Sequence, residues 1–287
     1  MTQRKAETLL AALITARSTS FLFSKIGLDG LGIFNLIALR YLIAFVILAL
    51  VFHKKMKAVR VSTLLHSAVL AGIFFALLTA ELSSLQRTDA STTAFLENSA
   101  IVFVPVFHAV LTRKMPKGAT VISSLVALCG VFCLTLKNGF SGFGPGQLFG
   151  ILAAMLYAAY ILVTAHFGDH EDTFQIGVLQ NGFLGLYGLI AAAVAETPHL
   201  PANGAQWISI LGLAVICSAF GLTLQPVAQS HTTAERAGLF CAISPVSAAL
   251  LSCFFLGENL GTTGILGGAL IMASIFIPKL HLRAAEG

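Results

Sequence analysis

The sequence predicts an all-α polytopic membrane protein with ten transmembrane helices, arranged as a five-plus-five inverted repeat. Hydrophobic residues make up 57% of the 287 residues, charged residues only 10%, and the mean hydropathy is +0.89. A soluble domain keeps a wide polar shell and could not hide so much apolar surface. This excludes a soluble enzyme, a nucleic-acid-binding protein and a disordered chain. Because the apolar runs are long and lack strand-type alternation, helices are favoured over an outer-membrane barrel.

Charged residues and glycine-bearing turns mark the ends of the first five helices. Arg4 and Lys5 precede the first helix, which we interpret as a retained span because Arg17 interrupts it and no small-residue cleavage site follows. A glycine-bearing turn at 27–32 and a basic stretch at 53–60 bound the second helix. Since about 20 residues cross the hydrocarbon core, the first five spans are predicted at 7–26, 33–52, 63–82, 90–112 and 119–137.

The last five helices are divided in the same way. A glycine-rich segment at 138–146 precedes the sixth helix, and the acidic run FGDHEDT at 167–173 follows it. That run is a solvated loop rather than a metal site, because it implies no fixed ligand geometry. The proline-bearing segment 196–206 precedes the eighth helix, and GENL at 257–260 separates the ninth from the tenth. These spans are predicted at 147–166, 174–195, 207–226, 235–256 and 261–279.

Lysine and arginine orient the chain. With the N-terminus in the cytoplasm, twelve of them lie at cytoplasmic helix ends and three at outer ends, while Arg17 and Arg40 fall inside the membrane. Such a bias predicts that both termini are cytoplasmic, in a bacterial-type inner (cell) membrane. The loop at 167–173 would also be cytoplasmic, although it has no lysine or arginine.

Two segments suggest an internal repeat. Residues 88–96 read TDASTTAFL and residues 232–240 read TTAERAGLF, and each opens a helix that later contains a proline, Pro105 or Pro245. Because five helices per half place the second half in the opposite orientation, the repeat is inverted, as in many secondary transporters. The two repeats are predicted at residues 1–140 and 141–287.

The order and spacing of several segments resemble a known family. They are ALRYLIAFVILAL (38–50), TDASTTAFLENSAIVFVPVF (88–107), LFGILAAMLYAAYILVTAH (148–166), the Leu-Gly-Glu segment (234–260) and GGALIMASIFI (267–277). Together they resemble the EamA-type, ten-helix branch of the drug/metabolite transporter superfamily. The resemblance implies a secondary transporter, most simply an exporter of a small polar or amphipathic metabolite such as an amino acid. It also implies alternating access around a midplane cavity lined by the first, third, fourth, sixth, eighth and ninth helices.

Two buried charges are the main candidates for contact with a substrate. Arg17 lies at the centre of its helix, where a charge costs about 2.5–3.5 kcal/mol on insertion scales and therefore has a function or a partner. The planar guanidinium, with its paired N–H donors, suits a carboxylate or a phosphate. Glu97 lies within the fourth helix, and a desolvated carboxylate is one way to carry a proton. The structural alternative is an ion pair between the two side chains.

The other candidate substrate contacts are aromatic or amide side chains inside apolar runs. Tyr157 and Tyr160 are three residues apart, so both can face one cavity. Core packing is the alternative for the tyrosines, and helix–helix hydrogen bonding is the alternative for the amides. The remaining candidates are Phe21, Phe95, Asn98, Gln180 and Ser244.

Residues predicted to act in gating or coupling include Glu97 and His108, which share a face if the fourth helix is straight. Pro105 and Pro245 remove helical hydrogen bonds at related places in the two halves, and such interruptions mark transport sites. A static kink is the alternative for the prolines, and a structural or snorkelling role is the alternative for Arg40. Arg40 and Glu81 complete the set.

No nucleotide-binding, cofactor or metal motif is found, so the expected partners are a small-molecule substrate, the lipid bilayer and protons as a coupling ion, with no nucleic acid. The chain holds no G-x-x-x-x-G-K-[ST] sequence. The alternative function is an intramembrane enzyme or a flippase that acts on lipid-linked substrates. An enzyme would need convergent acid and base groups, and the spans contain no H-E-x-x-H and no paired aspartates.

Overall fold

A computed structural model describes residues 3–56, 59–113, 118–135, 144–168, 172–224 and 243–285. Every regular element in these ranges is a helix, as the composition predicts. The elements are α1 (Gln3–Gly27), α2 (Ile33–Val51), α3 (Val61–Arg87), α4 (Ala90–Asn98), α5 (Ala100–Thr112), α6 (Gly118–Thr135), α7 (Pro145–Gly168), α8 (Thr173–Ala195), α9 (Gly204–Gly212), the π-helix η3 (Leu213–Leu222), α12 (Ile243–Leu256) and α13 (Gly261–Ala285).

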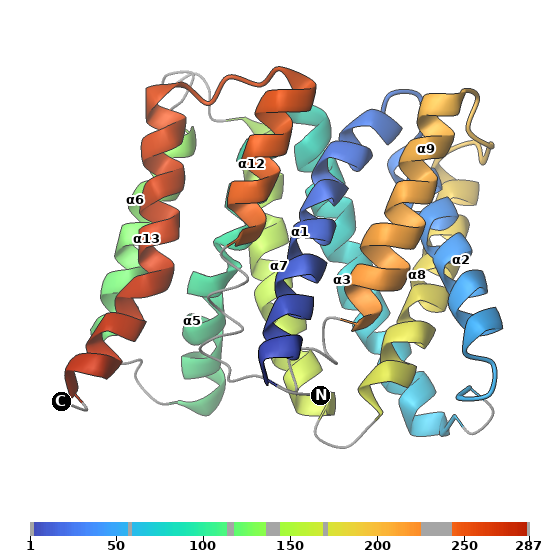
Figure 1. The fold of residues 1–287 in the computed structure, drawn as a ribbon, viewed down its shortest axis with the longest axis horizontal. Coiled ribbons are helices and arrows are strands. Elements are labelled where there is room, and N and C mark those ends of the chain that lie inside the picture. The colour runs from blue at the N-terminus through green and yellow to red at the C-terminus, as the bar shows by residue number, and fades with distance from the viewer. Residues whose placement is uncertain are drawn as a thin grey trace.

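The helices stand side by side in one bundle, and both chain ends lie at the same end of it (Figure 1). Helix α6 packs along α13 at one side of the bundle, and α2 packs along α8 at the other (Figure 1). Between them, α1 packs against α12 and η3, and α3 packs against α7. Segments from the two halves of the sequence are therefore interleaved throughout the bundle.

Within the described ranges, six helical segments are long and apolar enough to cross a membrane. Three more apolar helices in these ranges are shorter, at Val121–Cys133, Ser244–Leu256 and Gly261–Ser274. Leucine, valine and phenylalanine side chains are exposed along these helices, for example Phe254 at 85%. Exposed apolar surface of this kind fits a lipid environment. The six segments are Ile33–Val51, Val61–Arg87, Ala90–Leu111, Pro145–Thr164, Thr173–Ala195 and Gly204–Leu222.

The fourth predicted span is interrupted at Ser99, which separates α4 from α5. Side chains compete with the helical hydrogen bonds here: the Ser99 hydroxyl donates to the Leu96 carbonyl at 2.5 Å, and the Asn98 amide donates to the Ala94 carbonyl at 2.8 Å. We expected the interruption at Pro105, but α5 continues through that residue. Glu97 and His108 therefore lie on two separate helical segments, α4 and α5.

The eighth and ninth predicted spans also differ from uniform helices. The eighth is formed by α9 and the π-helix η3, in which backbone hydrogen bonds join residues five apart rather than four. Of the ninth predicted span, residues 235–242 lie outside the described residues. Pro245 is buried and lies two residues after Ile243, where the described part of α12 begins. The TTAERAGLF segment also lies outside the described residues.

Glycines allow α2 and α8 to approach closely. A Cβ atom on Gly188 would lie 2.7 Å from the backbone nitrogen of Ala38, and one on Gly185 would lie 2.8 Å from that of Leu42. No side chain fits at such distances, so the two backbones touch directly. Gly130 of α6 approaches α13 in the same way. Small residues at helix contacts are the usual means of packing helices within a membrane.

Charged side chains from distant segments cap two helix N-termini. The Glu258 carboxylate accepts hydrogen bonds from the backbone N–H groups of Ala90 (2.6 Å) and Ser91 (3.0 Å), at the start of α4. The Glu196 carboxylate accepts from Phe34 (3.1 Å) and Asn35 (2.9 Å), near the start of α2. A carboxylate satisfies N–H groups that have no partner within the helix and complements the helix dipole.

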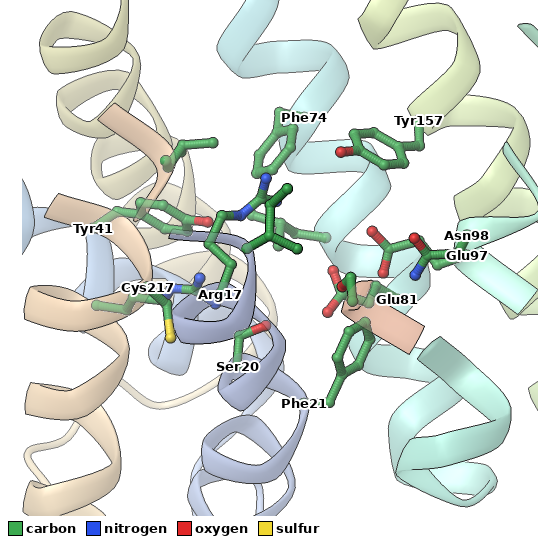
Figure 2. Close-up of a pocket in the computed structure, with 15 residues that line it drawn as sticks. Arg17, Ser20, Phe21, Tyr41, Phe74, Glu81, Glu97, Asn98, Tyr157 and Cys217 are labelled. Carbon is green, nitrogen blue, oxygen red and sulfur yellow. The ribbon is translucent and has the colours of Figure 1, made fainter. Parts of the chain in front are cut away.

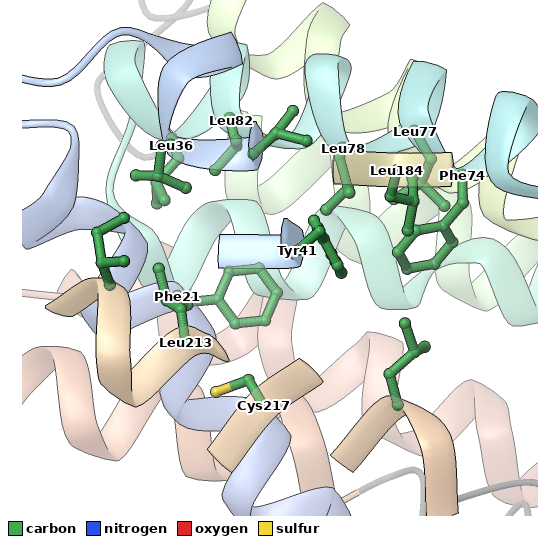
Figure 3. Packing of buried hydrophobic residues seen from close by; sticks show 14 of the residues in the cluster. Phe21, Leu36, Tyr41, Phe74, Leu77, Leu78, Leu82, Leu184, Leu213 and Cys217 are labelled. Atoms are coloured by element: carbon green, nitrogen blue, oxygen red, sulfur yellow. The ribbon is translucent and has the colours of Figure 1, made fainter. Parts of the chain in front are cut away.

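The apolar core lies in the middle of the bundle. Leu36 and Tyr41 of α2 pack with Phe74 and Leu78 of α3, and Leu213 of η3 joins them (Figure 3). These side chains are nearly or fully buried. The core borders one side of the central cavity, since Tyr41, Phe74 and Leu78 also line that cavity.

Candidate functional site

A cavity lies at the centre of the bundle, between segments from both halves of the sequence (Figure 2). Helices α1, α2, α3 and α4 form most of its wall, and α7, η3 and α12 complete it. The wall combines charged, aromatic and aliphatic side chains. They are Ile14, Arg17, Ser20, Phe21, Arg40, Tyr41, Phe74, Leu78, Glu81, Glu97, Asn98, Tyr157, Cys217, Leu222 and Ser244.

Arg17 extends into the cavity from the middle of α1 (Figure 2). Its aliphatic stem lies directly against Gly221 of η3, where a Cβ atom would clash with the arginine Cγ. Tyr157 of α7 and Glu97 of α4 line the same cavity (Figure 2). The π-helix and its glycine therefore hold the stem of this cation in place.

Arg40 supplies a second cation, from α2. Its Nε donates to the Ser218 hydroxyl at 2.7 Å, and its guanidinium lies 4.8 Å from the centre of the Tyr41 ring. The residue is 6% exposed. Hydrogen bonding and a cation–π contact thus hold Arg40 against the wall of the cavity.

Two carboxylates line the cavity on its α3 and α4 side. Glu81 is 5% exposed and Glu97 is 8% exposed. In Figure 2 their carboxylate groups lie near one another, with Asn98 beside them. The third predicted span, 63–82, ended one residue after Glu81. Because α3 continues to Arg87, Glu81 lies inside the helix and reaches the same cavity.

Eight of the residues that we predicted from the sequence line this cavity. Tyr160 and Gln180 lie behind the lining instead, where the Tyr160 hydroxyl donates to the Gln180 side-chain oxygen at 3.1 Å. The Tyr160 ring stacks with Tyr157 at a centroid distance of 6.3 Å and packs against Phe74. The eight lining residues are Arg17, Phe21, Arg40, Glu81, Glu97, Asn98, Tyr157 and Ser244.

The other predicted residues lie elsewhere. Phe95 is buried and packs against Gly268 and Ile271 of α13. His108 is exposed on α5. Pro245 lies within α12 and does not line the cavity. Pro105 lies within α5, and its side chain is outside the described part of the structure. The structure therefore does not bring Phe95, His108 or Pro245 to the central cavity.

Sequence reasoning missed several lining residues that helical spacing could have found. Ile14 and Ser20 lie three residues before and three residues after Arg17, on the same face of α1. Phe74 and Leu78 precede Glu81 by seven and three residues, again on one face. Once a buried charge marks the face toward the cavity, its neighbours at helical spacing follow. Cys217 and Leu222 of η3 could not be found in this way, because η3 contains no charged residue that would mark the face toward the cavity.

Membrane-length helices that surround a buried cavity with both cationic and anionic side chains define a class of protein. This is a multi-pass membrane protein with a polar cavity at its centre. The model of the EamA-like transporter family matches residues 5–136 and again residues 144–278. The chain belongs to the EamA-like transporter family, and it is a membrane transporter.

Relatives with known sequences agree with this assignment. An "uncharacterized transporter" of Archaeoglobus fulgidus is 26% identical over 287 residues, covering 95% of this chain and 96% of its own length. The "uncharacterized transporter YetK" of Bacillus subtilis is 24% identical over 296 residues, covering 99% of this chain and 89% of its own. A crystal structure of a protein with 18% sequence identity superposes with a TM-score of 0.69, covering 97% of this chain and 99% of that one. The last comparison shows that the fold is shared.

Proposed function

We propose that this transporter exports a small amphipathic metabolite with a carboxylate group, such as an amino acid, by alternating access. The observation that supports the proposal most directly is the Arg17 guanidinium in a central cavity that is also lined by apolar side chains. A guanidinium binds a carboxylate through two parallel hydrogen bonds. The apolar walls at Phe21, Phe74 and Leu78 suit the remainder of an amphipathic molecule.

The proposed architecture is ten spans in two inverted five-helix repeats, at residues 1–140 and 141–287. The separate matches of the family model to residues 5–136 and 144–278 support it. The proposed orientation has both termini in the cytoplasm, with the lysine and arginine bias as its basis. An externally active reporter fused after Gly287 would test this: low activity is expected, and high activity would contradict both the orientation and the inverted repeat.

The proposed transport cycle centres on Arg17 and Glu97. In the absence of substrate, the two side chains attract each other across the cavity. A substrate carboxylate competes with Glu97 for the guanidinium, and Glu97 then loses part of its cationic environment. A carboxylate in that position is easier to protonate unless the substrate itself brings a cationic group to it, so substrate binding and proton binding become linked. Arg40 and Glu81 form the second pair of opposite charges in the cavity and take part in gating.

Counterflow into proteoliposomes tests the proposed function. Vesicles that contain the purified full-length protein are loaded with one unlabelled metabolite, and uptake of the labelled metabolite is followed over a panel of amino acids, organic acids and amines. We expect uptake for at least one carboxylate-bearing compound and a large loss of that uptake in Arg17→Ala. Uptake that equals the protein-free control across the panel would refute the proposal. Uptake confined to lipid-linked compounds would favour the flippase alternative.

A further inference from the structure

Opposite charges are separated across the cavity. Arg17 and Arg40 belong to α1 and α2, whereas Glu81 and Glu97 belong to α3 and α4. Figure 2 shows Arg17 on one side of the cavity and the two glutamates on the other. Charges of opposite sign on facing walls attract each other. The arginine side accounts for a carboxylate group on the substrate. Glu81 and Glu97, on the other side, must bind a group that is not a carboxylate.

The Glu97 carboxylate is incompletely satisfied. The residue is 8% exposed, yet its Oε2 atom is fully buried and has no hydrogen-bond partner within the part of the chain that the structure describes. A buried polar atom without a partner costs about 1–3 kcal/mol, and more when it carries charge. The Glu97 side chain lines the cavity beside Asn98 (Figure 2).

Glu81 adds a second carboxylate beside Glu97, which favours binding of a cation between them. The Glu81 and Glu97 carboxylates lie near one another and repel each other electrostatically (Figure 2). A positively charged group between them would relieve this repulsion and would also donate a hydrogen bond to Glu97 Oε2. The pair therefore favours a small cationic group with several donors.

An ammonium group fits these requirements better than a metal ion. Across the described ranges, no group of three or more histidine, cysteine, aspartate or glutamate side chains comes together, so a divalent metal would lack its usual protein ligands. An ammonium group has three N–H donors and can bridge two carboxylates. It is also compact enough to sit between side chains of neighbouring helices.

We infer that Glu81 and Glu97 form the ammonium-binding subsite of this transporter, opposite the Arg17 subsite for the carboxylate. The inference rests on the proposed function and specifies its substrate class: a zwitterion with an apolar side chain. A zwitterion brings one positive and one negative group to the cavity and adds no net charge. An acid or an amine alone would add an uncompensated charge to a site of low dielectric, which is costly.

Matched ligands test the inference on the purified full-length protein. L-valine, L-leucine and L-phenylalanine are each compared with the acid that lacks the amino group and with the amine that lacks the carboxyl group. Apparent affinity is measured from thermal stabilisation over a range of ligand concentrations. The parent protein should bind at least one amino acid at least about tenfold more tightly than its acid and its amine, since a charge-assisted hydrogen bond contributes that much.

Isosteric variants then separate the two subsites. Glu81→Gln and Glu97→Gln should each weaken binding of the amino acid by about tenfold or more, while binding of the matched acid stays nearly unchanged. Asp29→Asn, which removes an exposed carboxylate in the turn after α1, should change neither. Equal weakening of the amino acid and the acid would overturn the inference, as would unchanged binding of both. A shift in the pH dependence alone would assign the pair to a proton and would also overturn it.

The outcomes distinguish the inference from the proposed function. If the parent shows counterflow of some metabolite but binds none of the three amino acids better than their acids and amines, transport stands and the ammonium subsite is refuted. If counterflow fails for the whole panel, the proposed function fails, and the inference fails with it. Because the ligand comparison on the parent protein requires no variant, misfolding of a glutamine variant does not prevent the test.

Discussion

Replacing Glu258 with alanine should loosen the start of α4, the helix that carries Glu97. The carboxylate accepts three hydrogen bonds there, from the backbone N–H of Ala90 at 2.6 Å, the backbone N–H of Ser91 at 3.0 Å and the Ser91 hydroxyl at 2.7 Å. Asp89, the residue at the N-cap position, makes no side-chain capping bond. Glu258 therefore supplies the cap that the local sequence does not.

The size of the effect follows from these contacts. A hydrogen bond to a charged group contributes about 1.5–3 kcal/mol when it is well buried. Glu258 is half-buried, so solvent can partly replace it, and we reduce the value to about 1 kcal/mol for each bond. Glu258→Ala should then lower the free energy of unfolding by about 2–3 kcal/mol. Glu258→Gln keeps one acceptor oxygen and should lose about half as much.

Denaturant unfolding in detergent micelles measures this change, with fluorescence of Trp207, the single tryptophan of the chain, as the probe. Glu196→Ala provides a matched comparison at the start of α2. Its carboxylate makes two backbone hydrogen bonds, at 3.1 and 2.9 Å, so its loss should cost less than the loss of Glu258. A Glu258→Ala protein within about 0.5 kcal/mol of the parent would refute the reasoning, because it would mean that water caps α4 equally well.

Three further predictions concern packing, the site and pH. Gly188→Leu should separate α8 from α2 and cost about 3 kcal/mol or more, measured by the same unfolding assay, whereas Gly72→Leu, with open space around it, should have little effect. Arg17→Lys keeps the charge but loses the paired N–H donors of the guanidinium, so counterflow should fall about tenfold while the melting temperature changes little. If the double variant Arg17→Ala, Glu97→Ala transports like the parent, the two residues are only a structural pair. The backbone carbonyls of Thr197 and Gly30 raise the pKa of the exposed His199 side chain, so its contribution to stability should be present below about pH 6.5 and lost as the pH rises; melting temperatures between pH 5.5 and 8 should show a smaller decline in His199→Gln, and identical slopes would exclude this contribution.

Hydropathy alone predicts where most of the helices lie. Lipid requires about 20 apolar residues with internally satisfied backbone groups, and this requirement acts on each segment independently of its neighbours. The predicted spans 33–52 and 174–195 therefore correspond closely to α2 and α8. Arg17 and Glu97 were identifiable for the same reason, because a charge inside an apolar run is expensive wherever it lies.

Tertiary packing decided which faces of these helices meet. Glu81 appeared to be a helix-end residue, and only the continuation of α3 and its rotation in the bundle bring it beside Glu97. Tyr157 and Tyr160 are equally polar in the sequence, yet residues three apart differ by about 60° around a helix, and only Tyr157 reaches the cavity. The break at Ser99 depends on side-chain hydrogen bonds to carbonyl groups, which hydropathy does not register. Sequence thus determined which residues are buried in the membrane, and the rotation of each helix against its neighbours determined which of them share a site.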